Sequence, residues 1–183
     1  MKLRLLLASL LATPLLASAA TYTKVDSQAS QVEFFYGQMG VNMEGIFPHI
    51  DGQINFDSAQ PEQASVSLLV KMGSVDTGSE EADAEVQKKA WFNVPEYPDA
   101  AFSSDSIQKT DENTFLVSGV LSIKGHEQVI EFPATLTEEN GQGLFKGSFE
   151  LKRGDFAIGE GAWSTFDIVA NEVRVDVSLI ATE

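Results

Sequence analysis

Apolar residues recur at every second position along most of the chain, which is the period of a β-strand with one buried face. The clearest case lies between Thr114 and Lys124, where apolar residues and a glycine alternate with mostly smaller or polar residues. The same alternation predicts further strands at 32–36, 41–47, 54–56, 66–70, 101–107, 129–136, 144–152 and 172–181. A hairpin-rich chain with about eight or more strands fits a closed antiparallel barrel better than a sandwich of two sheets.

The period changes from two to about four between Thr77 and Ala90, which predicts one short helix. Its acidic residues come early and its lysines late, an order that complements the helix dipole. Thr77 and Ser79 compete as the N-cap, and Pro95 prevents the helix from continuing. We expect this helix to lie at one end of the sheet and to close it.

The first 20 residues resemble a secretory signal peptide. A short basic start leads into an apolar run from Leu5 to Leu16, and the small residues that follow allow cleavage after Ala19 or Ala20. The run is shorter than the ~20 residues that a membrane-spanning helix needs. We therefore expect a periplasmic protein of residues 21–183, one domain without stable membrane insertion.

The net charge of −15 narrows the choice of partners. Removing the leader takes away two basic residues and makes the protein still more acidic. Because nucleic acids and anionic headgroups are bound by clustered lysine and arginine, neither is an expected partner. The chain has no cysteine, which excludes disulfides, thiolate metal sites and a cysteine nucleophile.

Residues that carry chemistry are sparse. His49 and His126 are the only histidines, and they lack the spacing of a metal-binding pair. No Gly-x-Ser-x-Gly segment is present. We predict no catalytic residue, no metal site and no cofactor. The alternative is a periplasmic enzyme acting on a hydrophobic substrate through one histidine and a nearby carboxylate, which requires a histidine buried in the pocket with a shifted pKa.

The apolar faces of the predicted strands are rich in aromatic residues, and this pattern has two explanations. A small barrel can be packed solid or can hold one small ligand. A solid core is typical of a structural or interaction protein without a ligand, whereas a hollow barrel is typical of a carrier. Periodicity alone does not separate them.

Several short segments carry a combination of residues that is specific when taken in order. They are Tyr22–Asp26 with Ser30 and Val32–Phe34, Gly45–Phe47 with Gly52–Asp57, Ser74–Gly78, Phe92–Pro98 with Ala101–Ser104, Gly119–Gly125 and Arg153–Gly159. Together they resemble the YceI-like family of periplasmic lipid-binding proteins over nearly all of residues 21–183. The resemblance implies an extended lipocalin-like antiparallel β-barrel with an elongated apolar tunnel for a polyisoprenoid chain, sometimes with a quinone-type head.

The resemblance also implies a non-enzymatic protein that sequesters or transports its lipid, with a possible part in storage or stress protection, and that can form a homodimer. Outward apolar residues such as Phe35 and Leu69 are candidates for that interface. Many family members carry a histidine before Ser30 and another near the next strand, where this chain has Ala29 and Gln38. The residues predicted to line the tunnel are Phe34, Tyr36, Met43, Phe47, Phe56, Leu68, Trp91, Phe92, Phe102, Phe115, Val117, Leu121, Phe132, Phe149, Phe156 and Trp163.

Overall fold

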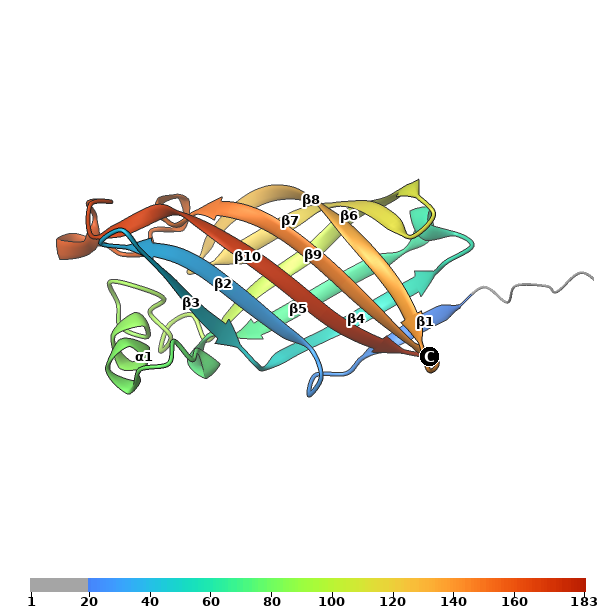
Figure 1. The fold of residues 1–183 in the computed structure, drawn as a ribbon, viewed down its shortest axis with the longest axis horizontal. Coiled ribbons are helices and arrows are strands. Elements are labelled where there is room, and N and C mark those ends of the chain that lie inside the picture. The colour runs from blue at the N-terminus through green and yellow to red at the C-terminus, as the bar shows by residue number, and fades with distance from the viewer. Residues whose placement is uncertain (1–19) are drawn as a thin grey trace, which may run out of the picture.

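The alternating segments form the wall of an elongated, closed antiparallel barrel (Figure 1). The computed structural model describes residues 20–183, so the predicted signal peptide and its cleavage site lie almost wholly outside the described part. The strands are β1 (Thr21–Val25), β2 (Gln31–Gln38), β3 (Val41–Phe47), β4 (Ile50–Asp57), β5 (Ser65–Lys71), β6 (Asp99–Asp111), β7 (Thr114–Ile123), β8 (His126–Glu139), β9 (Gln142–Lys152) and β10 (Val169–Thr182). The predicted fold class is confirmed, and β1 is the one strand that the alternation did not reveal.

Ten strand segments occupy eight positions around the barrel. Both β1 and β2 pair with β10, at Val25 opposite Ala181 and at Gln31 opposite Ser178. They therefore occupy one position as an interrupted strand. Because β4 pairs with β1 and β3 pairs with β2, these two segments share the next position in the barrel. At the break, the buried hydroxyl of Ser30 accepts a hydrogen bond from the Ile180 amide (3.0 Å), which ties the loop to β10.

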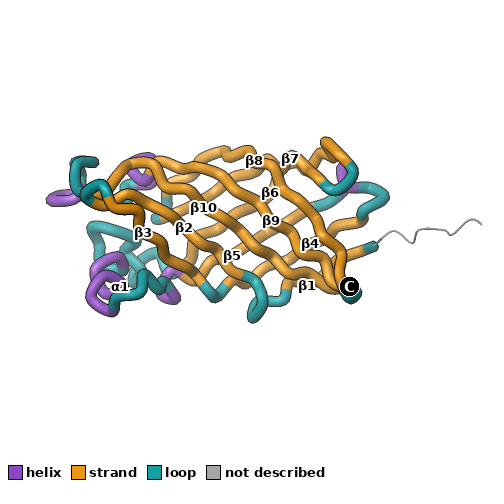
Figure 2. The backbone as a smooth tube through the Cα atoms, in the orientation of Figure 1, coloured by secondary structure: helices purple, strands orange, loops and turns teal. Residues whose placement is uncertain are grey.

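The wall is incomplete beside β3. In the described residues this strand has one neighbour, β2, apart from an isolated bridge between Ile46 and Asp76. The segment after that bridge carries α1 (Glu80–Val86), which lies beside β3 at one end of the barrel (Figure 1). Helical turns gather at the barrel ends, whereas strands make the wall (Figure 2). The short 3-10 turns are η1 (Pro61–Gln63), η2 (Met72–Ser74), η3 (Arg153–Phe156) and η4 (Gly161–Trp163).

The helix is shorter than the range predicted from Thr77 to Ala90. Ser79 is the N-cap, and its hydroxyl accepts a hydrogen bond from the Ala82 amide (3.4 Å). The helix ends at Val86 because the chain folds back there, and the Phe92 amide donates to the Val86 carbonyl (2.9 Å). The lysines predicted to complement the helix dipole consequently follow the last turn.

Candidate ligand-binding cavity

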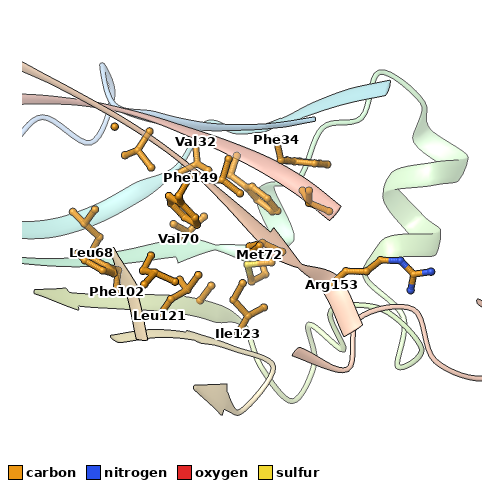
Figure 3. Close-up of a pocket in the computed structure, with 18 of the residues that line it drawn as sticks. Val32, Phe34, Leu68, Val70, Met72, Phe102, Leu121, Ile123, Phe149 and Arg153 are labelled. Carbon is orange, nitrogen blue, oxygen red and sulfur yellow. The ribbon is translucent and has the colours of Figure 1, made fainter. Parts of the chain in front are cut away.

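The barrel encloses an apolar cavity of about 520 Å³. Inward side chains from opposite walls converge on it, among them Phe34 of β2, Leu68 of β5 and Phe149 of β9 (Figure 3). An apolar cavity of about 150 Å³ already holds a molecule such as benzene, and ligand pockets commonly span about 300–1,000 Å³. The volume therefore falls within the range of ligand pockets, and the interior is not the filled core of the solid-barrel alternative.

Most of the residues predicted for the tunnel line this cavity. They are Phe34, Tyr36, Phe47, Phe56, Leu68, Trp91, Phe92, Phe102, Phe115, Val117, Leu121, Phe132, Phe149 and Trp163. Met43 and Phe156, which were also predicted for the tunnel, lie outside this lining. Met43 is half-buried on the incompletely paired β3. Phe156 is 1% exposed but packs in a cluster with Trp91 and Ile158 behind the cavity end.

Two kinds of lining residue were not predicted from the sequence. Aliphatic side chains on the same strand faces, such as Ile54, Val66 and Val70, were predictable because they share the alternation of the aromatic residues. Polar residues before and within α1, and Arg153 after β9, gave no such signal. Their place in the site follows from loop conformation, which periodicity does not encode.

Glycines on neighbouring strands make room for several inward aromatic rings. A Cβ atom added to Gly45 would lie 2.3 Å from the ring of Phe34, and one added to Gly147 would lie 2.7 Å from the ring of Phe132. Each ring therefore lies over a bare stretch of backbone. This arrangement keeps large side chains against the wall, so an interior rich in aromatic residues still leaves a cavity.

The end of the barrel away from α1 is closed by aromatic side chains. Phe56 meets Phe115 and Phe145 in edge-to-face contacts with ring centroids 5.2 and 5.0 Å apart. Tyr22 packs edge-on against Phe145 at 5.6 Å and is 2% exposed. Burial, together with the neighbouring Glu138 carboxylate, raises the pKa of Tyr22 to about 12. This end is an apolar floor.

The end beside α1 is polar. Thr77, Ser79, Glu81 and Glu85 contribute to the lining there. Lys88 Nζ lies 2.6 Å from the Glu85 carboxylate. This hydrogen bond is the main reason that the pKa of Glu85 is lowered, and the nearby indole N–H groups of Trp163 and Trp91 lower that pKa further.

The buried Trp91 side chain leaves one donor free. The indole is 8% exposed, and its Nε1 has no hydrogen-bond partner within residues 20–183, although it lies near the Glu85 carboxylate. The ring lines the cavity and packs against Trp163, with ring centroids 5.3 Å apart. The cavity end beside α1 therefore contains an unused donor.

Arg153 fixes the loop between β9 and β10 at the same end (Figure 3). Its side chain is buried, and burial lowers the pKa of the guanidinium. The guanidinium lies over the rings of Phe166 (4.8 Å) and Trp91 (5.7 Å). It donates hydrogen bonds of 2.7–3.2 Å to the backbone carbonyls of Ile158, Gly159, Trp163, Thr165, Val169 and Ala170. All of its donor groups are consequently used within the protein.

The histidines do not meet the requirement of the enzyme hypothesis. His49 and His126 are exposed, and neither lines the cavity. Among residues 20–183, no cluster of three histidine, aspartate or glutamate side chains is placed to hold a metal ion. No helix in this range has the length and hydropathy needed to cross a bilayer.

A closed antiparallel barrel with an apolar interior, a closed floor and a polar end is a lipocalin-like β-barrel. The family model described as "YceI-like domain" matches residues 23–181, and the chain belongs to this family.

Relatives and solved structures agree with this assignment. Proteins described as UPF0312 from Azotobacter vinelandii (31% identity, 78% of each chain) and Pseudomonas putida strain F1 (32%, 83% of this chain and 84% of the relative) are similar in sequence. The crystal structure of Burkholderia cenocepacia BcnA is 34% identical, with a TM-score of 0.83 over 87% of this chain and 100% of that chain. A polyisoprenoid binding domain from Saccharophagus degradans shares the fold (TM-score 0.71, 16% identity, 88% of this chain and 98% of that one).

Proposed function

We propose that this protein binds a long-chain polyisoprenoid, or a related isoprenoid quinone, inside the barrel and shields it from water in the periplasm without catalysis. The observation that carries the proposal is the apolar cavity of about 520 Å³ with a closed floor. The Saccharophagus degradans domain described as polyisoprenoid-binding supports it through the shared fold. Sequestration, transport and protection under stress are all roles that such binding serves.

The energetics of the cavity favour an occupied barrel. Apolar space that is left empty inside a protein is unfavourable, at roughly 24 cal/mol per Å³ for cavities made in protein cores. A ligand that fills the barrel removes part of this cost. Each buried methylene group of a ligand contributes about 0.8 kcal/mol. A long unbranched or isoprenoid chain therefore binds without an ionic anchor.

The test is native mass spectrometry of the protein purified from its own periplasm, followed by organic extraction and identification of the released lipid. A stoichiometric isoprenoid is the expected result, and the extracted protein should unfold at a lower temperature until the lipid is returned. A protein that arrives empty and takes up no isoprenoid overturns the proposal. Recovery from the periplasmic rather than the cytoplasmic fraction tests the location.

Dimerisation through an outward face is a separate part of the proposal. Phe35 lies under the guanidinium of Arg174, which is 4.1 Å from the ring, whereas Leu69 is 40% exposed. A homodimer should therefore use the β5 face around Leu69, and Leu69→Glu should convert it to a monomer in light-scattering measurements. A wild-type protein that is monomeric at high concentration contradicts this part.

A further inference from the structure

The two ends of the cavity differ in chemistry, and this difference orients a lipid. The floor consists of aromatic rings from β4, β7 and β9 in edge-to-face contact. The opposite end has hydroxyl and carboxylate groups before and within α1. A ligand with an apolar tail and a polar head is accommodated with its tail toward the floor and its head beside α1.

Besides the Gln38 amide, which also contributes to the lining, the donor available to such a head is the indole N–H of Trp91. This group is buried, lines the cavity and has no hydrogen-bond partner among the described residues. A buried donor without a partner is unfavourable, and an incoming acceptor such as a carbonyl or hydroxyl oxygen removes that penalty.

The same end lacks what an anionic head needs. The basic residues that contribute to the lining, within the part of the chain described, are Arg153 and Lys146. Arg153 directs its N–H groups at six backbone carbonyls and has none left for a phosphate. Lys146 is exposed and lies between the inward residues Phe145 and Gly147 of β9, so its charged end faces solvent.

Carboxylates at this end further disfavour an anionic head group. Glu81 and Glu85 both contribute to the lining from α1. Lys88 offsets the charge of Glu85 through its ion pair, but no lysine pairs with Glu81 among the described salt bridges. A phosphate or carboxylate drawn into this end would lose its hydration without gaining a cationic partner, which is unfavourable.

We infer that the α1 end of the cavity selects lipids with an uncharged, hydrogen-bond-accepting head over lipids with an anionic head. Trp91 supplies the donor, and Glu81 and Glu85 disfavour anions. This inference rests on the proposed function, because it specifies the class of head group carried by the isoprenoid that the barrel binds.

The test uses lipid-free protein, three probes that share one tail and a hydrocarbon reference. The probes are menaquinone with a geranylgeranyl side chain, geranylgeraniol and geranylgeranyl phosphate, with the headless hydrocarbon squalene as the reference. The quinone and the alcohol should bind at least tenfold more tightly than the phosphate. Equal or tighter binding of the phosphate overturns the inference while leaving the proposed function standing. Failure of all four probes to bind overturns the proposed function itself.

Variants at the α1 end separate the two contributions. Trp91→Phe should weaken quinone binding by a few-fold to about tenfold and leave squalene binding unchanged. Glu81→Gln combined with Glu85→Gln should reduce the discrimination against the phosphate. Glu80→Gln is the matched control, because Glu80 is on the same helix but outside the lining. A control that changes selectivity as much as the double variant contradicts a local role.

Nitrogen-15 NMR gives a readout that does not depend on affinity. The chain has two tryptophans, so only two indole N–H signals are expected. The quinone should shift the Trp91 signal downfield, as a newly formed hydrogen bond does, whereas squalene should not. The Trp91→Phe variant assigns the signal. A Trp91 signal that responds equally to quinone and squalene refutes the assigned contact.

Discussion

Gly147→Ala tests whether the glycines of the wall keep the cavity open. Gly147 lies on the inward face of β9, and its missing side chain leaves space for the ring of Phe132. An added Cβ would lie 2.7 and 2.9 Å from two ring carbons, closer than the 3.4 Å at which ordinary contact begins. The nearest backbone atom, the Pro133 carbonyl oxygen, is 3.6 Å away and allows the substitution. The ring must therefore move, and the open side is the cavity.

We expect Gly147→Ala to weaken ligand binding without destabilising the lipid-free protein. Overpacking typically costs about 1–3 kcal/mol, which corresponds to a 5- to 150-fold loss of affinity when the ligand competes for the space. The lipid-free protein should keep its unfolding midpoint, because alanine is at least as compatible with a strand as glycine. Titration of the lipid-free protein with the extracted lipid, followed by tryptophan fluorescence or calorimetry, measures the affinity.

Two further variants decide the interpretation. Gly147→Ala with Phe132→Leu should recover binding, since the smaller side chain no longer occupies the cavity. Gly37→Ala is the matched control, because Gly37 is also on a strand but outside the lining, and its added Cβ would meet Ala170 at an ordinary 3.4 Å. Unchanged affinity in Gly147→Ala, or an equal loss in Gly37→Ala, refutes the reasoning.

Other expectations concern the two ends of the barrel. Arg153→Met should lower the free energy of unfolding by roughly 3–5 kcal/mol in denaturant titrations, because six backbone carbonyls lose a charged donor that is itself buried. A loss below about 1 kcal/mol contradicts this. Burial raises the pKa of Tyr22 from 10.0 to about 12, so the folded state holds its proton more tightly and stability that is complete below pH 10 should fall as the pH rises toward 12. The fall should be smaller in Tyr22→Phe, and equal slopes in the two proteins are the contrary result. His49→Ala and His126→Ala should bind lipid as the wild type does, since both histidines are exposed outside the cavity, and a loss of binding in either would revive a role for histidine.

The wall of the barrel was predictable because it depends on a local rule. Alternation places inward residues two apart, and it located every strand except β1, where only Tyr22 of five residues is buried. The helix was located, but its end was placed too late. Apolar spacing continues through Ala90, whereas the chain turns back at Val86 under hydrogen bonds that form only in the folded loop.

The α1 end of the site was not predictable by the same rule. Arg153 belongs to a segment that carries the family resemblance, yet its role depends on six carbonyls spread from Ile158 to Ala170, whose positions are set by the fold of a loop. Trp91 was predicted as an apolar lining residue. That its N–H is buried without a partner depends on how the loop after α1 folds, which the sequence pattern does not encode.

Whether the barrel is hollow or filled is decided by strand register, and this explains why periodicity left both possibilities open. A filled and a hollow barrel share the same alternation, since both place large apolar residues inward. What differs is the size of the residue on the neighbouring strand over which each ring lies. In this chain Phe34 is directly opposite Gly45, and the ring of Phe132 reaches over Gly147 of the next strand. With alanine or valine at these glycines, the same rings would have to move toward the interior and would reduce the cavity.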